Sequence, residues 1–495
     1  MAVETELKLH ISPDKLQRLK RHPLLRSLAI ERARTLKLYS IYYDTADLAL
    51  QRNAMALRLR RVGKQWLQTL KGGGRSSAGL HQRNEWEMPV PAEQLDLAAL
   101  KLCGGKLPHG VRNRLQPVFV TDFTRNVRLL DFEGAQIELC MDSGEIRAGQ
   151  GMCPISELEL ELISGAPQQL FRLALKLIEI VPLEVEHTSK AEYGYRLFSA
   201  SRPEVSKGRF AALQSSQDIG SALQLLIASC LSHIQANVGG ALLKLDEEYL
   251  HQVRVGLRRL RVLLSLAKRV HPGAELDDLH RRVSELCIAL GRSRDWDVFI
   301  TQTLAPVCAR LPEHEGLRAL LVTCKRMRDK QHAGMESSLA SQDFQRLLLR
   351  FGAWMQAVDR AGDPQSSLEK FASKILDKRS RQVLAAGNAC SIEEPAQFHV
   401  LRIACKKLRY SLEMFGSLLP HHKYKAYLNR LTILQDILGS MHDIAVAHRL
   451  LDELDNAARH DTLALVRGWM EHDYAGLITL FDKNWAGFAA QTKCW

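Results

Sequence analysis

The stretch Glu4-Thr5-Glu6-Leu7-Lys8 places three charged side chains at alternate positions near the start of the chain. Residues i, i+2 and i+4 of a β-strand point to the same face, so two carboxylates and an ammonium would share one side. The alternation recurs in Ser156–Leu162, which reads S-E-L-E-L-E-L, and in Leu57-Arg58-Leu59-Arg60. Strands with one apolar face and one face charged in both signs predict a barrel with a polar interior. Such an interior suits a polyanion held by metal ions and cationic side chains.

Length and composition limit the class of protein. A chain of 495 residues predicts two or three domains. Its 68 Lys and Arg against 55 Asp and Glu, a net charge of +13, favour an anionic partner. Ten scattered cysteines without a CxxC pair indicate reduced thiols. We expect no signal peptide and no apolar run near the roughly 20 residues that span a membrane, hence a cytoplasmic protein without a membrane partner.

The periodicity of the sequence changes along the chain. Residues 1 to about 200 contain short alternating segments separated by turn signals such as Gly72-Gly73-Gly74. From about residue 217 onward the pattern is helical throughout. The sequence therefore predicts an α+β protein of two domains, a β domain over residues 1–203 and an all-α domain over residues 217–495.

The helical half contains an internal repeat. His251–Arg261 matches His399–Arg409, and Leu290–Val298 matches Leu438–Val446. Both matches have the same offset, since 399 − 251 and 438 − 290 each equal 148. Two anchors at one offset predict a duplicated helical unit, with repeats at about 217–364 and 365–495.

Each repeat carries a stripe of basic side chains. At about 100° per residue, the four residues of each stripe fall within roughly 80° of one helix face. The stripes are His251, Arg254, Arg258 and Arg261 in the first repeat, and His399, Arg402, Lys406 and Arg409 in the second. They indicate either a bound anion or a solvated basic face. Nucleic acid is disfavoured because no aromatic residues that stack bases interleave them.

Three acids follow the stripes, at Asp295, Asp297 and Asp443. They either hold the basic side chains in place or are purely structural.

Two family resemblances follow from these motifs. The H-x-x-R-[VI]-x-x-[RK]-[RK]-L-R helices, each followed by L-G-x-x-[RH]-D, resemble the CHAD domain, whose members are associated with inorganic polyphosphate. The E-x-E-x-K strand resembles the CYTH or triphosphate-tunnel superfamily, with further matches at Tyr42-Tyr43-Asp44-Thr45, Thr69-Leu70-Lys71 and Ser189-Lys190. That superfamily includes class IV adenylate cyclases, thiamine triphosphatases and inorganic triphosphatases. The order CYTH then CHAD is similar to that of bacterial inorganic triphosphatases.

The resemblance implies an eight-stranded antiparallel tunnel that binds triphosphate and a divalent metal, Mg²⁺ or Mn²⁺. The cations implied to bind phosphate oxygens are Lys8, Arg58, Arg60, Lys71, Arg83, Arg125 and Lys190. The implied metal ligands are Glu4, Glu6, Glu157, Glu159 and Glu161. Cations and metal-bound carboxylates suffice for this chemistry, because phosphoryl transfer depends mainly on positioning and on neutralising charge.

Several assignments stay open at this point. Arg125 and Arg128 are alternatives that depend on the register of one strand. Glu85 has either a direct role or, like Glu87 and Asp142, pairs with tunnel cations. No GxxxxGK[ST] motif occurs, which disfavours a Walker-type nucleotidase.

We expect metal-dependent hydrolysis of inorganic tripolyphosphate to pyrophosphate and phosphate, with polyphosphate binding by the basic helical stripes. The alternatives are a nucleoside or thiamine triphosphatase, with a cyclase behind it, and a non-catalytic polyphosphate-binding protein.

Overall fold

The computed structural model describes residues 2–77, 79–357, 367–454 and 460–495, with the side chains of 2, 3, 74–77 and 83 left aside. The chain divides into two compact units. The first contains the residues up to Lys207 together with Leu231–Tyr249 and Ser341–Val358, and the second contains Gly208–Cys230, Leu250–Ala340 and the remainder of the chain. The predicted repeat boundary at residues 364 and 365 lies outside the described residues.

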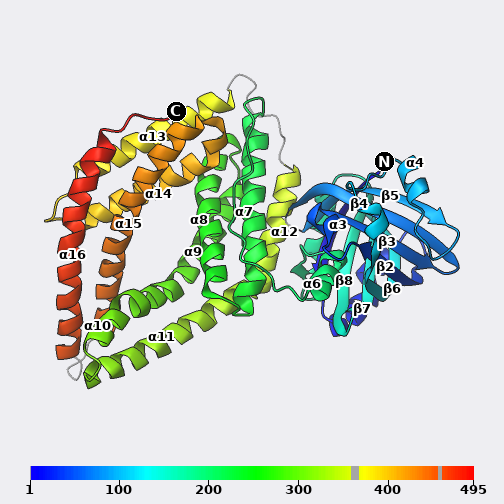
Figure 1. Cartoon of the computed structure of the whole chain (residues 1–495), viewed down its shortest axis with the longest axis horizontal. Coiled ribbons are helices and arrows are strands. Elements are labelled where there is room, and N and C mark those ends of the chain that lie inside the picture. Colours follow the sequence, from blue (N-terminus) through cyan, green and yellow to red (C-terminus); the bar gives the residue numbers. More distant parts are fainter. Residues whose placement is uncertain (1, 78, 358–366, 455–459) are drawn as a thin grey trace. The chain divides into compact units, whose positions relative to one another are not determined.

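The first unit is built on a closed antiparallel barrel (Figure 1). Eight strands follow the order β5-β4-β3-β2-β6-β7-β8-β1, and a pairing of β1 with β5 closes the ring. A ninth strand of two residues, β9, adds to β1. The eight-stranded tunnel is thus confirmed, with this one short addition. The strands are β1 (Ala2–His10), β2 (Arg34–Asp44), β3 (Met55–Val62), β4 (Gln65–Ser77), β5 (Leu80–Val90), β6 (Gln116–Phe132), β7 (Ala135–Ala148), β8 (Gly151–Ser164) and β9 (Glu184–Val185).

The two faces of the strands have different surroundings. Leu7, Leu9, Leu158 and Leu160 point out of the barrel and are fully buried, because α1 and α5 pack on β1 and β8. The charged residues that alternate with these leucines therefore point into the barrel. Along these strands, the apolar residues therefore form a core on the outside of the barrel, and the charged residues form the wall of its interior.

Helices cover the barrel and close one end of it. The helices of the first part of the chain are α1 (Pro13–Lys20), α2 (Pro23–Ser27), α3 (Ala49–Arg52), α4 (Leu97–Leu102), the 3₁₀ turn η1 (Arg112–Arg114), α5 (Gln168–Leu177) and α6 (Lys190–Ser199). The ring of Tyr195 on α6 is buried among Tyr42, Phe119 and Phe123 of the barrel interior. One end of the interior is therefore apolar and filled, and the charged residues occupy the rest.

A helix from much later in the chain, α12 (Gln342–Ala357), also belongs to the first unit. The side-chain oxygens of Gln342 and Gln345 accept hydrogen bonds from the backbone N–H groups of Leu183 and Val185, at 3.0 and 2.9 Å. A Cβ atom at Gly352 would lie 2.0 Å from the Phe171 ring of α5, so only glycine allows this close approach.

The second unit is helical. Its elements, including α7, which both units share, are α7 (Ile219–Leu242), α8 (Glu247–Val270), α9 (Ala274–Val298), the π-helical turn η2 (Phe299–Leu304), α10 (Ala305–Arg310), α11 (Glu315–Leu339), α13 (Leu368–Asn388), α14 (Pro395–Phe415), the 3₁₀ turn η3 (Gly416–Leu418), α15 (His421–Asp452) and α16 (His460–Ala489). Moving the start of α8 by 148 residues reaches Pro395, the start of α14. The same shift places α9 on α15, so the predicted duplication corresponds to two helix pairs.

The expectation that no apolar segment approaches membrane-spanning length is wrong. The helix α7 is long and apolar enough to cross a membrane by length and composition, although 61% of its most apolar window is buried within the protein. Leu226, Ile227 and Leu231 on this helix are almost fully buried. A core helix passes the same test, so this one segment is weak evidence for a span.

Candidate functional site

The barrel interior brings together charged residues from distant parts of the sequence. Strand register pairs Lys8 with Glu159 across β1 and β8. It pairs Lys71 with Glu85 across β4 and β5, and Arg125 with Asp142 across β6 and β7. A cavity in this interior is lined by Glu4, Glu6, Lys8, Tyr42, Ala56, Arg58, Arg60, Lys71, Arg125, Glu159, Ser189, Lys190 and Ala191. Most of the predicted tunnel residues therefore lie around one cavity.

Three buried acids and three cations form the deepest part of this site. The carboxylate oxygens of Asp142, Glu157 and Glu159 lie within 4.8 Å of one another. Lys8 Nζ donates to Glu159 Oε1 at 2.7 Å, and Arg125 Nε donates to Asp142 Oδ1 at 2.8 Å. Lys190 Nζ contacts all three acids, at 2.7 Å from Asp142 and 3.0 Å from Glu159. Charges buried at this depth are stable only when they are paired in this way.

The pairing shifts the pKa values of the buried groups. Burial disfavours the ammonium of Lys8, but Glu159 and Glu6 outweigh it and hold the pKa of Lys8 well above its usual range. Burial likewise opposes ionisation of Glu159, yet Lys190, Lys8 and Arg125 hold its pKa well below the usual range. Burial raises the pKa of Glu157 to about 7, although Lys190 opposes the shift. Lys8, Arg125 and Lys190 all contact Glu159, whereas only Lys190 contacts Glu157 among the described ion pairs, so the negative charge of Glu157 is less fully neutralised.

Helix α6 positions Lys190. Ser189 caps the helix: its hydroxyl accepts from the N–H of Glu192 at 3.2 Å, and the Glu192 carboxylate accepts from the Ser189 N–H at 2.7 Å. Lys190 is the first residue of the helix, and Gly194 one turn later lets α6 approach the Phe119 ring. The helix that closes the apolar end of the barrel thus directs its first side chain into the charged part.

A second group of cations lines the opposite wall. Lys71 Nζ lies 2.5 Å from Glu4 Oε2 and 3.3 Å from Glu85 Oε2, and Arg58 Nη2 lies 3.6 Å from Glu85 Oε1. Burial and the neighbouring Arg58 and Arg125 lower the pKa of Arg60 to about 10. The described contacts of Arg60 are with neutral groups: a hydrogen bond to Ser40 Oγ at 3.2 Å and the Phe123 ring at 6.0 Å from its centroid.

A third group consists of acids with few cations. Glu6 faces Glu161 across β1 and β8, and Glu138 faces Glu161 across β7 and β8. Burial, then Glu4, Glu138 and Glu6, raise the pKa of Glu161 to about 7. Carboxylates that raise one another's pKa fit a hard divalent cation such as Mg²⁺ or Mn²⁺. Among the described residues, the acids whose oxygens lie within 4.8 Å of one another are Asp142, Glu157 and Glu159. The donor set is therefore chemically suited to the metal that the tunnel family implies.

The register decides one alternative left open by the sequence. The Arg125 side chain lies in the barrel interior, whereas Arg128 Nη2 donates to the backbone oxygen of Lys20 at 2.7 Å outside it. The side chain of Arg83 lies outside the described ones, although its backbone pairs with Glu4. Glu85 pairs with two tunnel cations, and Glu87 accepts from Thr69 Oγ1 at 2.9 Å.

Two interior residues were not predicted as site residues. Asp142 joins the acidic group, although the sequence predicted only ion pairing for it. Tyr42 lines the cavity, and its pKa is lowered because Arg58 and Arg60 outweigh the effect of burial. Its place in the Tyr42-Tyr43-Asp44-Thr45 match was a usable signal.

The helical unit contains a separate cationic cluster where the two repeats meet. We define it as Arg254 and Arg258 on α8 with Arg402 and Lys406 on α14. Burial, then Arg402 and Arg258, lower the pKa of Lys406 to about 7. Burial, then Arg258, lower the pKa of Arg254 to about 10. The first repeat thus adds positive charge to the surroundings of Lys406 in the second repeat.

The acids that follow the stripes lie beside this cluster. Burial raises the pKa of Asp295 and of Asp443, although Arg254 and Arg402, respectively, oppose these shifts. Asp295 Oδ2 also lies 3.1 Å from Arg449 Nη2. Asp297 instead lies 3.0 Å from His332 Nε2. All three acids offset part of the cluster's charge, because Asp295 and Asp297 raise the pKa of Arg254 and Asp443 raises that of Lys406.

Positive charge nevertheless remains unpaired in the cluster. Within the described part of the chain, the Nε atoms of Arg258 and Arg402 are buried without a hydrogen-bond partner. Buried donors of this kind are costly unless a ligand or water satisfies them.

The other predicted stripe residues have different surroundings. Arg409 donates to Glu413 at 2.8 Å and to Gln435 at 3.1 Å, so an acid outside the stripe neutralises this end of it. Arg261 lies near Lys407 and lowers its pKa together with burial and Arg379. His399 Nδ1 lies 3.2 Å from His442 Nδ1, while His251 is half-buried on α8. His442 was part of the matched L-G-x-x-[RH]-D motif, so the sequence contained a signal for it.

Family comparisons agree with this division into a barrel and a helical part. The model of the CYTH domain matches residues 2–195, and the model of the CHAD domain matches residues 225–452. The chain therefore belongs to the proteins that join a CYTH domain to a CHAD domain.

Particular relatives match different parts of the chain. A Haemophilus influenzae protein named inorganic triphosphatase is 37% identical over 207 residues, which are 40% of this chain and 56% of that protein. The chain thus spans little more than half of that relative. An uncharacterised Mycobacterium tuberculosis protein is 25% identical over 473 residues, 88% of this chain and 86% of its own length. The crystal structure of the CHAD domain from the plant Ricinus communis aligns with a TM-score of 0.52 at 30% identity, over 59% of this chain and 99% of that one.

Proposed function

We propose that the barrel hydrolyses inorganic tripolyphosphate to pyrophosphate and phosphate with a divalent metal, and that the helical unit binds inorganic polyphosphate. One observation carries the first part: six cationic side chains from four strands and α6 converge on one cavity that also contains three carboxylates. The cations are Lys8, Arg58, Arg60, Lys71, Arg125 and Lys190. A chain of phosphates is the kind of ligand that replaces such internal ion pairs with equally strong ones.

The cations and the carboxylates of the cavity have different roles. The arginines and lysines bind and orient phosphate oxygens and neutralise the charge that develops as the phosphoanhydride bond breaks. Glu4, Glu6 and Glu161 would hold Mg²⁺ or Mn²⁺, with Glu159 and Glu157 next to them. The metal supplies Lewis-acid stabilisation of phosphate charge when it is bound.

An inorganic substrate is favoured over a nucleotide or thiamine triphosphate. Tyr42 is the one aromatic residue among the described ones that line the cavity, and its ring is stacked on Phe119 at a centroid distance of 4.4 Å. No described ring in the cavity wall is therefore free to stack a base. The name of the Haemophilus relative, inorganic triphosphatase, supports the same substrate.

The direct test is phosphate release from tripolyphosphate, ATP and thiamine triphosphate, each with Mg²⁺, Mn²⁺ or a chelator. We expect tripolyphosphate to be strongly preferred and turnover to require the metal. Glu4→Gln and Glu6→Gln should abolish turnover, because each removes a carboxylate charge without changing its shape, while Glu93→Gln in an exposed loop should not. Equal rates on ATP, or full activity of both tunnel variants, would refute this assignment.

Polyphosphate binding by the helical unit is supported by the cationic cluster and its unsatisfied arginine donors. We expect replacement of Arg254, Arg258, Arg402 and Lys406 by alanine to remove most of the affinity for long-chain polyphosphate. Arg281→Ala, which removes an exposed arginine already paired with Asp278 and Glu285, is the matched control. Unchanged polyphosphate affinity at physiological salt would favour a solvated basic face instead. Binding of double-stranded DNA as tight as that of polyphosphate would contradict the exclusion of nucleic acid.

A cytoplasmic location is part of the same proposal. All ten cysteines are free thiols, as expected in a reducing compartment.

A further inference from the structure

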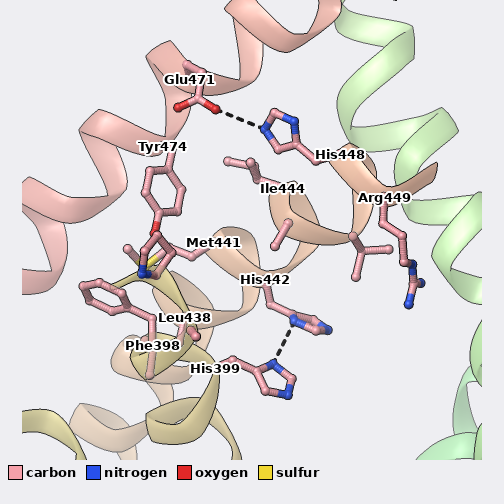
Figure 2. Close-up of a pocket in the computed structure, with 14 residues that line it drawn as sticks. Phe398, His399, Leu438, Met441, His442, Ile444, His448, Arg449, Glu471 and Tyr474 are labelled. Atoms are coloured by element: carbon pink, nitrogen blue, oxygen red, sulfur yellow. Dashed lines mark hydrogen bonds and ion pairs between the residues drawn. The ribbon is translucent and has the colours of Figure 1, made fainter. Parts of the chain in front are cut away.

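A cavity of about 420 Å³ opens among α14, α15 and α16 of the helical unit, next to the cationic cluster (Figure 2). Its size lies within the range of small-molecule sites, roughly 300–1,000 Å³. Phe398, Leu438, Met441 and Ile444 form an apolar middle. Neither the proposed hydrolysis nor a bare phosphate chain has a use for an apolar cavity of this size.

The cavity has polar groups at two opposite ends, as Figure 2 shows. At one end, His399 Nδ1 and His442 Nδ1 face each other at 3.2 Å. Burial is the main cause that lowers the pKa of His442 to about 3, and the cations Arg402, Lys406 and Arg449 add to it, so an anion placed there would lie near several positive charges. At the other end, His448 Nε2 lies 3.1 Å from the carboxylate of Glu471, whose side chain is 65% exposed.

These two ends and the middle differ in the ligand chemistry that each accepts. The apolar middle is bordered by the rings of Phe398 and Tyr474, which suit a flat aromatic body. The Glu471 carboxylate accepts hydrogen bonds only, so it suits a group that presents N–H donors. The histidine end and the adjoining Arg402 and Lys406 suit a phosphate.

We infer that this cavity binds a nucleotide whose base carries N–H donors on its edge. The base lies in the apolar middle with its edge toward Glu471, and its phosphate lies at the histidine pair beside Arg402. An alkyl phosphate would match the histidine end and the apolar middle but would offer no N–H donor to Glu471, which would then keep only its contact with His448. The inference does not depend on hydrolysis in the barrel. It does share Arg402 and Lys406 with the proposed polyphosphate site, so the two ligands should compete.

Calorimetric titration of the full chain with GMP, ribose 5-phosphate and octyl phosphate tests this inference. We expect saturable GMP binding, weakened by about tenfold or more when the base is absent, as in ribose 5-phosphate. Ala445→Trp fills the cavity from an exposed position of α15 and should abolish GMP binding. Ala426→Trp, at an exposed position of the same helix away from the cavity, should bind GMP normally. Glu471→Gln should weaken GMP binding and leave octyl phosphate unaffected.

Three outcomes would overturn the inference. They are the absence of saturable GMP binding, GMP binding that Ala445→Trp leaves unchanged, and octyl phosphate binding that is tighter than GMP binding and insensitive to Glu471→Gln. A circular-dichroism spectrum and an unfolding midpoint equal to those of the wild type confirm that the helical unit of Ala445→Trp is folded. If the wild-type chain hydrolyses nothing, the proposed function fails, while the GMP titration stays interpretable.

Discussion

Arg125 and Arg128 show how a single strand register separates two arginines of the same chemistry. Arg125 holds Asp142 with two nitrogen atoms, at 2.8 and 2.6 Å, and also contacts Glu159. A lysine cannot reproduce this planar fork. We expect Arg125→Lys to lower kcat/KM for tripolyphosphate by about 10² or more.

The matched control is Arg128→Lys, because Arg128 points out of the barrel. Its kcat/KM should stay close to the wild-type value. Equal losses in the two variants would show that the barrel interior does not discriminate between these positions and would contradict the proposed role of Arg125.

Two sets of site residues could be predicted from the strand pattern alone, because their strands repeat a charge at every second position, whereas Lys71, Arg125 and Lys190 were predicted from the family resemblance. Glu4, Glu6 and Lys8 lie on one strand, and Glu157 to Glu161 on another, so period two alone placed each set on one face. Asp142 has no such alternation around it. Its role depends on Lys190, which reaches it from a helix far along the chain. The alternation of residues along a strand does not predict the contact between Asp142 and Lys190.

The protonation of Lys406 should make polyphosphate binding depend on pH. Its pKa is lowered to about 7 by burial and by Arg402, Arg258 and Arg254, while Asp443 opposes the shift. The free protein therefore loses this positive charge as the pH rises through about 7. A bound polyanion favours the charged form, so affinity should fall between about pH 6 and about pH 8 and binding should take up a proton.

Calorimetry in buffers of different ionisation enthalpy would measure that proton uptake. Lys406→Met should bind more weakly at low pH and show neither the uptake nor the decline. His442 does not titrate in this window, because its pKa is lowered to about 3. Proton uptake of the same size in Lys406→Met would assign the effect to another group.

At the scale of elements, α6 connects the apolar filling of the barrel to its charged site. A Cβ atom at Gly194 would lie 2.2 Å from the Phe119 ring. That ring is held between Tyr42 and Tyr195, at centroid distances of 4.4 and 5.1 Å, so it has little room to move. We expect Gly194→Ala to displace α6 and to destabilise the protein by about 1–3 kcal/mol.

Because Lys190 begins the same helix, Gly194→Ala should also reduce tripolyphosphate hydrolysis. Thermal unfolding and phosphate release measure the two effects. Gly476→Ala in α16, where a Cβ atom would meet nothing within 4 Å, should instead be neutral or stabilising by up to about 1 kcal/mol. A Gly194→Ala variant as stable and active as the wild type would mean that α6 does not fix Lys190.

The helical elements were predicted from their periodicity, but the cavity among α14, α15 and α16 was not. Its lining comes from three helices, and the apolar residues that α14 and α15 contribute, such as Phe398 and Leu438, resemble ordinary core positions in the sequence. Periodicity predicts which face of a helix is buried. It does not predict whether the buried faces of three helices fill the space between them.

At the scale of the molecule, the compact units do not coincide with a cut between residues 203 and 217. The first unit also contains Leu231–Tyr249 and Ser341–Val358. Within it, α12 packs on Phe171 through Gly352 and supplies the Gln342 and Gln345 acceptors for the backbone of residues 183 and 185. A single cut in the sequence cannot assign α12 to the barrel unit, because by its sequence α12 is one more helix in a helical region.

We therefore expect a fragment of residues 1–207 to be less stable than the barrel in the full chain. It would expose the Phe171 face of α5 to water and leave the N–H groups of Leu183 and Val185 without their partners, beside the strand that pairs with β1. Newly exposed apolar surface promotes association, so the fragment should bind a hydrophobic dye and sediment as aggregates. In the full chain, Gln342→Ala together with Gln345→Ala should lower the unfolding midpoint without dye binding, because α12 still covers Phe171. A monomeric fragment that binds no dye and unfolds at the midpoint of the full chain's barrel would show that α12 contributes nothing to the stability of the barrel.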